Sequence, residues 1–274
     1  IRKDGAVMPV EISTRIITIG GKPMLLSAGR DVTERKKAEA ELQILLADLE
    51  SKNAELNDFA YVVSHDLKAP LRAIGTLADW LIADYGEQLD EDGREQLDLL
   101  AARVRRMHGL IEGVLSYSRV GRIQETRVAV DLNAALPEVI DSIGAPDTFD
   151  ISVMPGLPAV VVEPTRIRQV FENLLSNAVK YNDNEAPEIS VSFKEDGVYW
   201  RFTVADNGPG IDEKYYDKIF RMFQTLNARD EYESTGVGLT LVRKIIHMYG
   251  GEVWVESTPG VGTSFHFTLP KAME

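Results

Sequence analysis

The stretch FAYVVSHDLKAPLR, residues 59–72, has the apolar spacing of an amphipathic helix and contains a histidine. The buried stripe that this spacing predicts runs on past the stretch and consists of Val63, Leu67, Leu71, Ile74 and Leu81. His65 lies about 200° around the helix from Val63, so we expect its imidazole on the solvent side. A nucleophile requires this exposure.

The chain around this stretch is helical in composition from residue 34 to residue 84. Apolar residues at heptad spacing predict a coiled-coil seam, interrupted at Lys52, which consists of Ala38, Leu42, Leu45, Leu49, Leu56, Phe59 and Val63. A second amphipathic run follows a polar turn near residues 85–93 and contains Leu97, Leu100, Val104, Met107, Ile111, Val114 and Ser118. Two such helices predict an antiparallel hairpin. The apolar stripe that one hairpin leaves open predicts a homodimeric four-helix bundle.

Strand patterns flank the helical region on both sides. Residues 6–19 and 23–28 are apolar and β-branched around Gly20 and Gly21, which predicts a hairpin with a glycine turn. Beyond residue 125, the patterns predict strands at 127–130, 151–153, 158–162, 188–194, 198–205, 251–256 and 263–269, and helices at 164–181 and 238–249. This alternation predicts an α/β domain with one helical layer on a mostly antiparallel sheet.

The composition is that of an ordinary globular protein, with 274 residues, 44% hydrophobic and 27% charged. A formal net charge of −13 argues against a nucleic-acid partner. The absence of cysteine excludes disulfides, thiolate zinc sites and a cysteine nucleophile. The sequence has no apolar run of the roughly 20 residues that span a bilayer and no signal-peptide pattern, so we expect a cytoplasmic segment without membrane contact. The chain opens with Ile1 in a strand-like region, and we expect that an upstream segment has been removed.

Charged neighbours give His65 the surroundings of a phosphoryl acceptor. Lys68 and Arg72 follow at i+3 and i+7 on the same helix face, where cations can neutralise a phosphoryl group. Asp66 can accept the proton of one ring nitrogen and leave the other nitrogen to attack phosphorus. Adjacent residues do not face each other on a helix, so Asp66 must reach around it. The alternative is an ordinary solvated histidine, and structural roles fit the remaining histidines, His108, His247 and His266.

Two asparagines on a predicted helix form the first part of a candidate nucleotide site. Asn173 and Asn177 are i and i+4 in FENLLSNAVKY, residues 171–181, so their side chains share one face. Amide oxygens can bind Mg²⁺ when phosphates complete its coordination shell. Lys180 follows three residues after Asn177 and can reach a phosphate. Alone, two asparagines on a helix are more often caps or surface residues.

Three glycine-containing blocks extend the candidate site. In DNGPGI, residues 206–211, the glycines let the backbone approach a flat ligand, and Asp206 can accept a hydrogen bond from an exocyclic amine. The block STGVGL, residues 234–239, opens a helix whose free N–H groups can bind phosphate. The block PGVGTSF, residues 259–265, either closes the pocket or forms a hairpin turn. The chain lacks the P-loop and dinucleotide-binding patterns.

The string SHDLKAPL, residues 64–71, resembles the H-box of histidine kinases, in which this histidine is phosphorylated. The later blocks resemble, in order, the N, G1, G2 and G3 boxes of the ATPase fold that histidine kinases share with Hsp90, MutL and gyrase B. The resemblance covers residues 55–270 and points to histidine kinases specifically, because the other ATPases lack the helical hairpin. Phe220 and Phe223 resemble the F box at the base of a mobile ATP lid, residues 212–237, and core aromatics are the alternative.

The resemblance implies a set of functional residues. Asn177 is implied to bind Mg²⁺ with help from Asn173, and Asp206 is implied to recognise adenine. The whole set implied to bind ATP is Asn173, Asn177, Lys180, Tyr181, Asp206, Gly208, Gly210, Ile211, Phe220, Phe223, Thr235, Gly236, Val237, Gly238, Leu239 and Thr263. The catalytic set is His65 as phosphoacceptor, Asp66 as general base, Lys68 and Arg72.

The resemblance also implies a multidomain organisation. Residues 1–33 resemble the C-terminal fragment of a PAS-like sensor domain, with an unrelated edge hairpin as the alternative, and residues 34–57 form a coiled-coil linker. Residues 58–120 are an all-α dimerisation and histidine phosphotransfer hairpin. Residues 126–272 are an α/β sandwich of the Hsp90, gyrase and histidine-kinase ATPase type, which is the catalytic ATP-binding domain. The link near residues 119–126 is expected to be a hinge.

The reaction implied is transfer of the ATP γ-phosphoryl group to His65, and then to an aspartate of a response-regulator receiver domain. Ala69 stands where many family members have Thr or Asn to position a water, so we expect weak phosphatase activity. Glu163 stands where Asp is commoner, and we expect little consequence. Two alternatives are a non-catalytic dimeric scaffold that binds ATP, and a protein-refolding or mismatch-repair ATPase, against which the hairpin argues.

Overall fold

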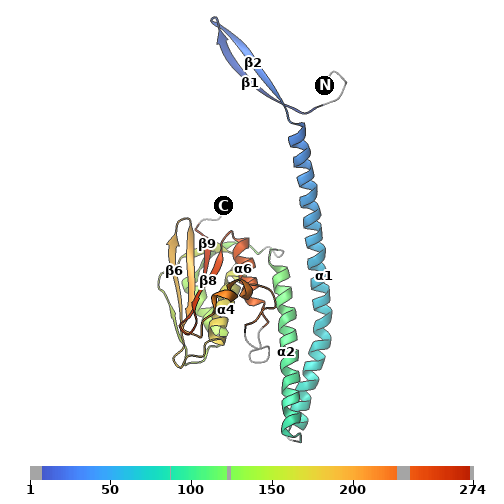
Figure 1. Cartoon of the computed structure of the whole chain (residues 1–274), viewed down its shortest axis with the longest axis vertical. Coiled ribbons are helices and arrows are strands. Elements are labelled where there is room, and N and C mark those ends of the chain that lie inside the picture. The colour runs from blue at the N-terminus through green and yellow to red at the C-terminus, as the bar shows by residue number, and fades with distance from the viewer. Residues whose placement is uncertain (1–7, 87, 122–124, 227–234, 272–274) are drawn as a thin grey trace. The chain divides into compact units, whose positions relative to one another are not determined.

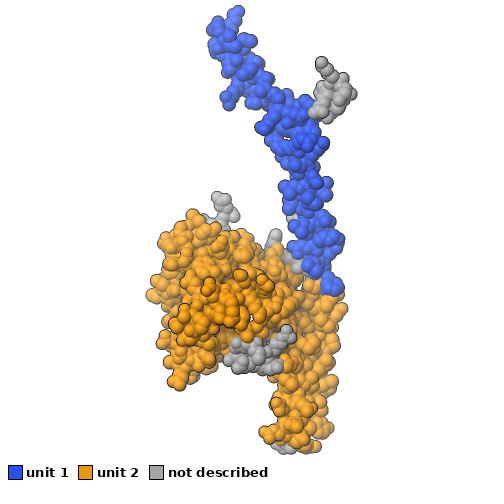
Figure 2. Space-filling view, in the orientation of Figure 1, with its two compact units in different colours: residues 1–59 blue, residues 60–274 orange. Residues whose placement is uncertain are grey.

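The computed structural model describes residues 8–86, 88–121, 125–226 and 235–271. The chain divides into two compact units, residues 1–59 and 60–274, which Figure 2 shows in blue and orange. The boundary falls within a long helix, between Phe59 and Ala60. The first unit contains a β-hairpin and the first part of that helix, and the second unit contains the remainder of the helix and every later element.

A two-stranded hairpin opens the first unit. Strands β1 (Val10–Ile19) and β2 (Lys22–Asp31) pair antiparallel, with Ile19 opposite Lys22. Gly20 and Gly21 connect them, both with positive φ, as a two-residue type I′ turn requires. The predicted hairpin is confirmed, although residues 6 and 7 lie outside the described part of the chain and β2 extends beyond its predicted end. The assignment to a PAS-like domain stays a prediction.

Helix α1 (Thr33–Tyr85) is one continuous helix of 53 residues. Its N-terminus is capped by Asp31, whose Oδ1 accepts a hydrogen bond from the backbone N–H of Thr33 at 2.9 Å. The helix continues through Pro70 without a break, which confirms the predicted helix over residues 34–84. The leucines of the heptad seam are exposed in the single chain: Leu42, Leu45, Leu49 and Leu56. The coiled coil therefore stays a prediction about two chains.

Helix α2 (Glu91–Arg119) runs antiparallel to the part of α1 that belongs to the second unit (Figure 1). Near the open end of this hairpin, the guanidinium carbon of Arg119 lies 5.8 Å from the ring centroid of Tyr61. Further along, Nζ of Lys68 lies 2.6 Å from Oε1 of Glu112. The predicted antiparallel hairpin is therefore confirmed. None of the described helices is long and apolar enough to cross a bilayer.

The interior of the hairpin differs from the predicted apolar stripe of α1. The residues of α1 that are buried against α2 are Ser64, Leu71 and Ala78, of which only Leu71 was in the predicted stripe. The remaining predicted residues are 38–46% exposed: Val63, Leu67, Ile74 and Leu81. The reason is that α1 has two apolar sides. The side with smaller residues packs on α2, and the side with larger residues stays open on a single hairpin.

The C-terminal part of the second unit contains a five-stranded sheet of order β4-β6-β7-β9-β8. Its strands are β4 (Asp150–Val153), β6 (Glu188–Asp196), β7 (Tyr199–Asp206), β8 (Val253–Thr258) and β9 (Gly262–Pro270). Strand β4 pairs parallel with β6, and every other pair is antiparallel, so the predicted mostly antiparallel sheet is confirmed. Strands β3 (Val128–Asp131) and β5 (Ala159–Val162) form a separate antiparallel pair.

Three helices accompany this sheet: α3 (Leu132–Ile143), α4 (Pro164–Lys180) and α6 (Gly238–Met248). A short 3-10 turn, η1 (Glu213–Tyr215), and helix α5 (Tyr216–Ile219) follow β7. Helix α3 was not among the elements predicted from the sequence, although residues at both of its ends mark it. Asp131 caps it by accepting a hydrogen bond from the backbone N–H of Asn133 at 2.9 Å, and Gly144 ends it in the left-handed conformation. Pro137 inside the helix obscures the pattern.

The core lies between one face of the sheet and the helices, which Figure 1 shows as a layer beside the strands. Its centre is a cluster of three fully buried rings, with Phe171 from α4, Phe202 from β7 and Phe267 from β9. Their centroids are 5.1–6.2 Å apart, in edge-to-face and stacked arrangements. This packing fixes α4 against the central strands, and therefore fixes the asparagines of α4 relative to the end of β7.

Candidate functional site

A cavity of about 320 Å³ lies beside α4, the end of β7, the start of β9 and the start of α6. Its wall includes most of the residues predicted to bind a nucleotide: Asn173, Asn177, Lys180, Tyr181, Asp206, Gly210, Ile211, Thr235, Gly236, Gly238, Leu239 and Thr263. Four predicted residues are not part of the wall: Gly208, Phe220, Phe223 and Val237. Segments that are far apart in the sequence therefore meet at one concave site.

The asparagine pair of α4 lies at the side of the cavity that faces α6. Nδ2 of Asn173 donates a hydrogen bond to the backbone oxygen of Gln169 at 2.6 Å, so its orientation is set by its own helix. A Cβ atom added at Gly238, the first residue of α6, would lie 2.5 Å from Oδ1 of Asn173. Glycine is therefore required for this close approach. Asn177 joins the cavity wall one turn further along α4.

Asp206 ends β7 and is partly buried in the wall of the cavity. Its Oδ1 accepts a hydrogen bond from the backbone N–H of Gly208 at 2.9 Å. Burial raises the pKa of the Asp206 carboxyl, and backbone hydrogen bonds from Gly208 and Thr263 oppose that shift. Gly208 thus contacts the carboxylate and is not part of the cavity wall, and its role in ATP binding stays a prediction. Gly210 has φ of 73°, and a Cβ there would lie 2.3 Å from the backbone oxygen of Thr258.

Phe220 and Phe223, the aromatic residues predicted at the base of the lid, are not part of the cavity wall. Phe220 is 6% exposed, and its backbone oxygen accepts a hydrogen bond from Oγ1 of Thr240 at 3.0 Å. It is a core aromatic, which was the alternative interpretation. Phe223 has φ of 63° and donates its backbone N–H to the backbone oxygen of Gly236 at 2.9 Å. This bond connects two parts of the predicted lid that flank residues 227–234, which lie outside the described residues.

Several wall residues were missed by the sequence analysis: Ser176, Ala178, Pro209, Ile219, Gln224, Thr225, Leu226 and Phe265. Most are apolar or small, and an apolar residue that faces a cavity has the same sequence pattern as one that faces the core. Four of them lie within the predicted blocks, namely Ser176, Ala178, Pro209 and Phe265, so their position in a block was a usable signal. The remainder, Ile219 and residues 224–226, lie in the segment predicted as the lid, which did not indicate which of its residues line the cavity.

His65 is exposed on α1, with a side-chain exposure of 73%. Its Nδ1 lies 3.2 Å from Oδ1 of Asp66, so the carboxylate of the adjacent residue does reach the imidazole. The ring of Tyr61, one turn earlier, is stacked near it with a centroid distance of 6.5 Å. The imidazole is therefore accessible, and one of its nitrogens has an acidic hydrogen-bond partner.

Lys68 and Arg72, the two cations predicted near His65, differ in their contacts. Lys68 forms its ion pair with Glu112 of α2, at 2.6 Å, rather than extending freely beside the imidazole. Glu112 also lies 3.8 Å from Nε2 of His108, so His108 belongs to the same group of charges. Arg72 is one turn beyond Lys68 and is exposed. The sequence could not predict Glu112 as the partner because the contact connects two helices.

Helix α2 closely approaches the segment that leads into α6 through two of its glycines. A Cβ atom added at Gly113 would lie 2.9 Å from Cβ of Val237, and one added at Gly109 would lie 2.9 Å from Cγ2 of Thr235. Val237 is 2% exposed, so it packs between α2 and the domain core and not into the cavity. Helix α2 therefore contacts the segment that leads into α6.

The end of α2 also contacts α6. Lys244 of α6 donates a hydrogen bond to the backbone oxygen of Tyr117 at 2.6 Å, and its Nζ lies 4.0 Å from the Tyr117 ring centroid. Burial lowers the pKa of Lys244, with a smaller contribution from Arg166. Arg166 donates to the backbone oxygen of Arg119 at 3.1 Å. The predicted hinge at residues 119–126 thus begins at an anchored residue, and its residues 122–124 lie outside the described part of the chain.

Glu163 occupies a buried position between two elements. It accepts hydrogen bonds from the Tyr249 hydroxyl and, at 3.4 Å, from Nε of Arg127. Burial, followed by the hydrogen bond to Glu163, raises the pKa of Tyr249. The exposed fraction of Glu163 is 8%. Its carboxylate links the residue that precedes β3 to the residue that follows α6.

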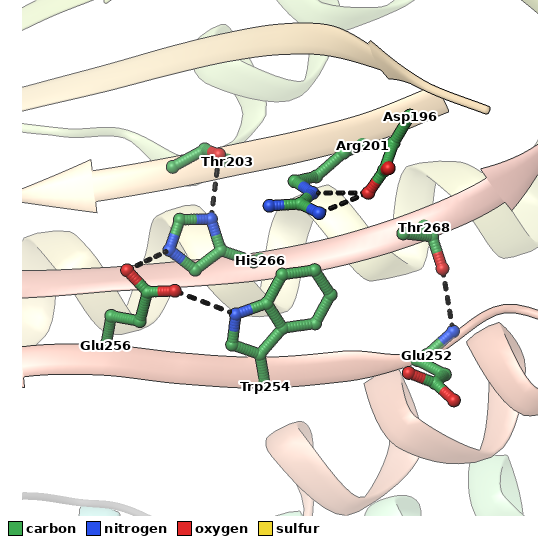
Figure 3. Close-up of polar contacts among 8 residues, drawn as sticks. All are labelled: Asp196, Arg201, Thr203, Glu252, Trp254, Glu256, His266 and Thr268. Carbon is green, nitrogen blue, oxygen red and sulfur yellow. Dashed lines mark hydrogen bonds and ion pairs between the residues drawn. The ribbon is translucent and has the colours of Figure 1, made fainter. Parts of the chain in front are cut away.

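His266 packs on the sheet face away from the helices, where Figure 3 shows it between Thr203 and Glu256. Its Nδ1 lies 2.9 Å from Oγ1 of Thr203, and its Nε2 lies 3.6 Å from Oε2 of Glu256. Trp254 stacks on its ring at a centroid distance of 5.2 Å. Burial lowers the pKa of His266. These contacts agree with the structural role predicted for His266.

Two family profiles match the chain. Residues 55–122 match the His Kinase A (phospho-acceptor) domain, and residues 162–273 match the histidine kinase-, DNA gyrase B- and HSP90-like ATPase. The matches are consecutive and together include both His65 and the cavity. They agree with the resemblance found in the sequence.

Curated relatives share the same region. The chain is 40% identical to cyanobacterial phytochrome B of Nostoc sp. over 234 residues, which are 84% of this chain and 31% of the relative. It is 33% identical to the adaptive-response sensory kinase SasA of Synechococcus sp. over 261 residues, which are 89% of this chain and 69% of the relative. The chain thus spans about a third of the length of the phytochromes it matches and about two thirds of SasA.

A solved structure has a similar arrangement of elements. The crystal structure of full-length ShkA in complex with AMPPNP matches 79% of this chain and 46% of its own, with a TM-score of 0.57 and 26% identity. The consecutive family matches, the identity to SasA over most of both chains and the position of His65 on the helical hairpin lead to one assignment. The chain belongs to the histidine kinase family.

Proposed function

We propose that the chain uses ATP to phosphorylate His65 and then transfers the phosphoryl group to an aspartate of a response-regulator receiver domain. The observation that carries the proposal is the contact of 3.2 Å between His65 Nδ1 and Asp66 Oδ1 on an exposed helix face. That face belongs to the same compact unit as a cavity of nucleotide size.

The contact suggests how the imidazole is activated. With its Nδ1 proton donated to Asp66, His65 keeps a lone pair on Nε2 for attack on the γ-phosphorus of ATP. A bond from Nε2 to phosphorus then forms, the bond from phosphorus to the β,γ-bridging oxygen breaks, and ADP leaves. Asp66 accepts the Nδ1 proton as the ring gains positive charge. Asp66 is therefore proposed as general base.

The cavity supports ATP as the phosphoryl donor. We assign the adenine amine to Asp206, which accepts hydrogen bonds at the end of β7, and the phosphates to the N-terminus of α6 at Gly238. The amide oxygens of Asn177 and Asn173 suit Mg²⁺ when phosphates provide the other ligands. No group of three His, Asp or Glu suited to a metal exists among the described residues, so the ion would depend on these amides and on ATP. Bound Mg²⁺ neutralises phosphate charge.

The cations of α1 have a proposed role after attack. Arg72 is exposed on α1, and Lys68 is paired with Glu112. We propose that Lys68 leaves Glu112 when His65 carries a phosphoryl group. The doubly charged phosphoryl group attracts the Lys68 ammonium more strongly than the partly exposed Glu112 carboxylate does. Ala69 has no hydrogen-bonding side chain to position a water, so we expect little phosphatase activity.

The functional chain is proposed to be a homodimer in the cytoplasm, with a receiver domain as its partner. The open apolar side of α1 supports the dimer, because large side chains there are exposed on one hairpin: Leu67, Ile74, Leu77, Trp80 and Leu81. We assign residues 34–57 to a coiled-coil linker, 58–120 to the phosphoacceptor domain and 126–272 to the catalytic domain. Residues 1–33 stay assigned to a PAS-like fragment.

Incubation with ATP labelled on the γ-phosphate tests the proposal. The expected label is acid-labile and base-stable, as a phosphohistidine is, and it passes to an isolated receiver domain. His65→Gln should abolish the label while ATP binding persists, and the matched change His247→Gln, at an exposed position of α6, should retain it. ATP binding without any label in the unsubstituted chain would refute the kinase and favour an ATP-binding scaffold.

A further inference from the structure

We propose that Glu163 is a positioning residue for phosphoryl transfer, because it anchors Arg127 and so limits the length of chain between the helical hairpin and the catalytic domain. The inference rests on the proposed kinase reaction and deepens it. Glu163 precedes α4, and Arg127 precedes β3. Neither residue is part of the cavity wall, so the pair would act on the reach of the domain and not on ATP itself.

The two residues stand opposite each other at the end of a strand pair. In the antiparallel register of β3 and β5, Val128 is paired with Val162. One step beyond this pair, the opposite residues are Arg127 and Glu163. Nε of Arg127 donates a hydrogen bond to Oε1 of Glu163 at 3.4 Å. A cross-strand ion pair therefore closes the ladder at the end where the chain enters the domain from α2.

Tyr249, the residue after α6, holds the carboxylate of Glu163 in place. Its hydroxyl donates to Oε2 of Glu163 and accepts from the backbone N–H of Glu163 at 3.2 Å. The guanidinium carbon of Arg127 also lies 5.4 Å from the ring centroid of Tyr249. The Glu163 side chain is 11% exposed and that of Arg127 is 41% exposed. Arg127 is thus the outer member of a contact whose other two members are buried.

The carboxylate of Glu163 is committed to this contact. Glu163 is the N-cap residue of α4, but its side chain makes no hydrogen bond to the first turn of that helix. A buried carboxylate requires partners, and loss of one partner from such a pair is costly. Arg127, Glu163 and Tyr249 all belong to the catalytic domain, so we expect their contact to persist when the domain moves.

The contacts at the end of α2 are of a different kind. Lys244 and Arg166 of the catalytic domain donate to backbone oxygens in the last turn of α2, at 2.6 and 3.1 Å. Movement of the domain away from α2 must break these two bonds. The chain that then spans the gap consists of residues 120–126, because the next residue is the anchored Arg127.

The length of this span affects how often bound ATP meets a phosphoacceptor histidine. Release of Arg127 allows β3 to separate from β5 at this end, and the span can then grow to residues 120–131. The effective concentration of two tethered groups falls with about the −3/2 power of the tether length, which corresponds here to about a two- to threefold lower rate of transfer. The residues of the cavity wall are unchanged, so ATP affinity should be unchanged.

Arg127→Met in the full chain tests the inference, and this half-exposed side chain can be replaced without opening the core. We expect faster amide exchange in β3, an unchanged Kd and KM for ATP, and a saturating rate of autophosphorylation lower by about two- to threefold. Arg127→Lys keeps the charge and should recover most of the lost rate. Arg168→Met is the matched control, because Arg168 pairs with Glu138 of α3, and it should keep the full rate.

The double variant of Arg127→Met and Glu163→Gln should be no slower than the slower single variant, because the two side chains form one anchor. A full rate in Arg127→Met, no recovery in Arg127→Lys, or additive losses in the double variant would overturn the inference and leave the kinase proposal standing. A weaker ATP affinity in Arg127→Met would also overturn it, because the pair would then support the nucleotide site. No phosphorylation of the unsubstituted chain would overturn both proposals.

Discussion

Nδ1 of His65 lies 3.2 Å from Oδ1 of Asp66, although the two residues are adjacent on α1. Adjacent helical side chains point about 100° apart, so this contact requires the aspartate to turn toward the imidazole. The result is a carboxylate beside an imidazole on one exposed surface, and we propose that the other ring nitrogen attacks phosphorus.

Replacement of Asp66 by Asn should remove the general base without changing the size of the side chain. We expect the rate of autophosphorylation to fall by about 10²- to 10⁴-fold, while ATP affinity stays unchanged because the cavity is elsewhere. Single-turnover labelling and nucleotide titration measure the two effects. Asp79→Asn, on the exposed side of the same helix, is the matched control and should keep the full rate. An Asp66→Asn chain as fast as the control would exclude Asp66 from proton transfer.

Substitutions of the two partners in the ion pair between Lys68 and Glu112 should have opposite effects on the rate of autophosphorylation. Glu112→Gln frees Lys68 for the phosphoryl group, so the rate of autophosphorylation should rise by about two- to fivefold, as expected for a partly exposed charge. Lys68→Met should lower the rate, and Glu112→Gln should give no gain when Lys68 is already replaced. A fall in rate for Glu112→Gln would instead mean that the pair itself is needed for catalysis.

Gly113 on α2 allows close approach of Val237. Substitution there should therefore have opposite effects on the stability of α2 and on the packing at the start of α6. Gly113→Ala adds a methyl group that raises the helix stability by about 1 kcal/mol, yet the same atom crowds Val237. We expect faster amide exchange at the start of α6, and a larger effect for Gly113→Leu. Hydrogen-exchange mass spectrometry measures both helices. Protection of α6 that does not change with the size of residue 113 would show that the contact has no energetic role.

His266 predicts a pH dependence of stability. Burial lowers its pKa, with further lowering by Arg201 and Lys194 and an opposing effect of Glu256, so the folded chain binds this proton less readily than the unfolded chain does. The stability associated with neutral His266 is present above its ordinary pKa and decreases as the pH falls below about 6.5. Melting temperatures of the full chain at pH 7.5 and 5.5 should therefore differ less in His266→Gln. Equal differences in both chains would contradict this role.

The sequence predicted most of the fold because its signals are local. The heptad spacing of α1, the glycine turn of the first hairpin and the paired asparagines of α4 are all readable within a few turns or residues. The side of α1 that packs on α2 could not be predicted, because Ser64 and Ala78 on that side are less apolar than Val63 and Leu67 on the open side. The packing partner, and not hydrophobicity alone, decided which side is buried.

The site was predictable only where its residues belong to recognisable blocks. Contacts between distant segments have no sequence signal, as the ion pair of Glu112 on α2 with Lys68 on α1 shows. Phe220 shows the converse, because a residue within a recognised block turned out to be part of the core. Spacing along the chain identifies the chemical groups, while the fold decides which of them meet.

Peptide mapping of the chain after reaction with ATP tests phosphorylation of His65 most directly. Digestion at neutral to basic pH preserves a phosphohistidine, so mass spectrometry can locate the phosphoryl group on a single peptide. We expect it on the peptide that contains His65, with fragment ions that assign it to the imidazole, and on no peptide of the His65→Gln chain. A phosphoryl group on His108, His247 or His266, or none on any peptide of a chain that binds ATP, would contradict the proposed function.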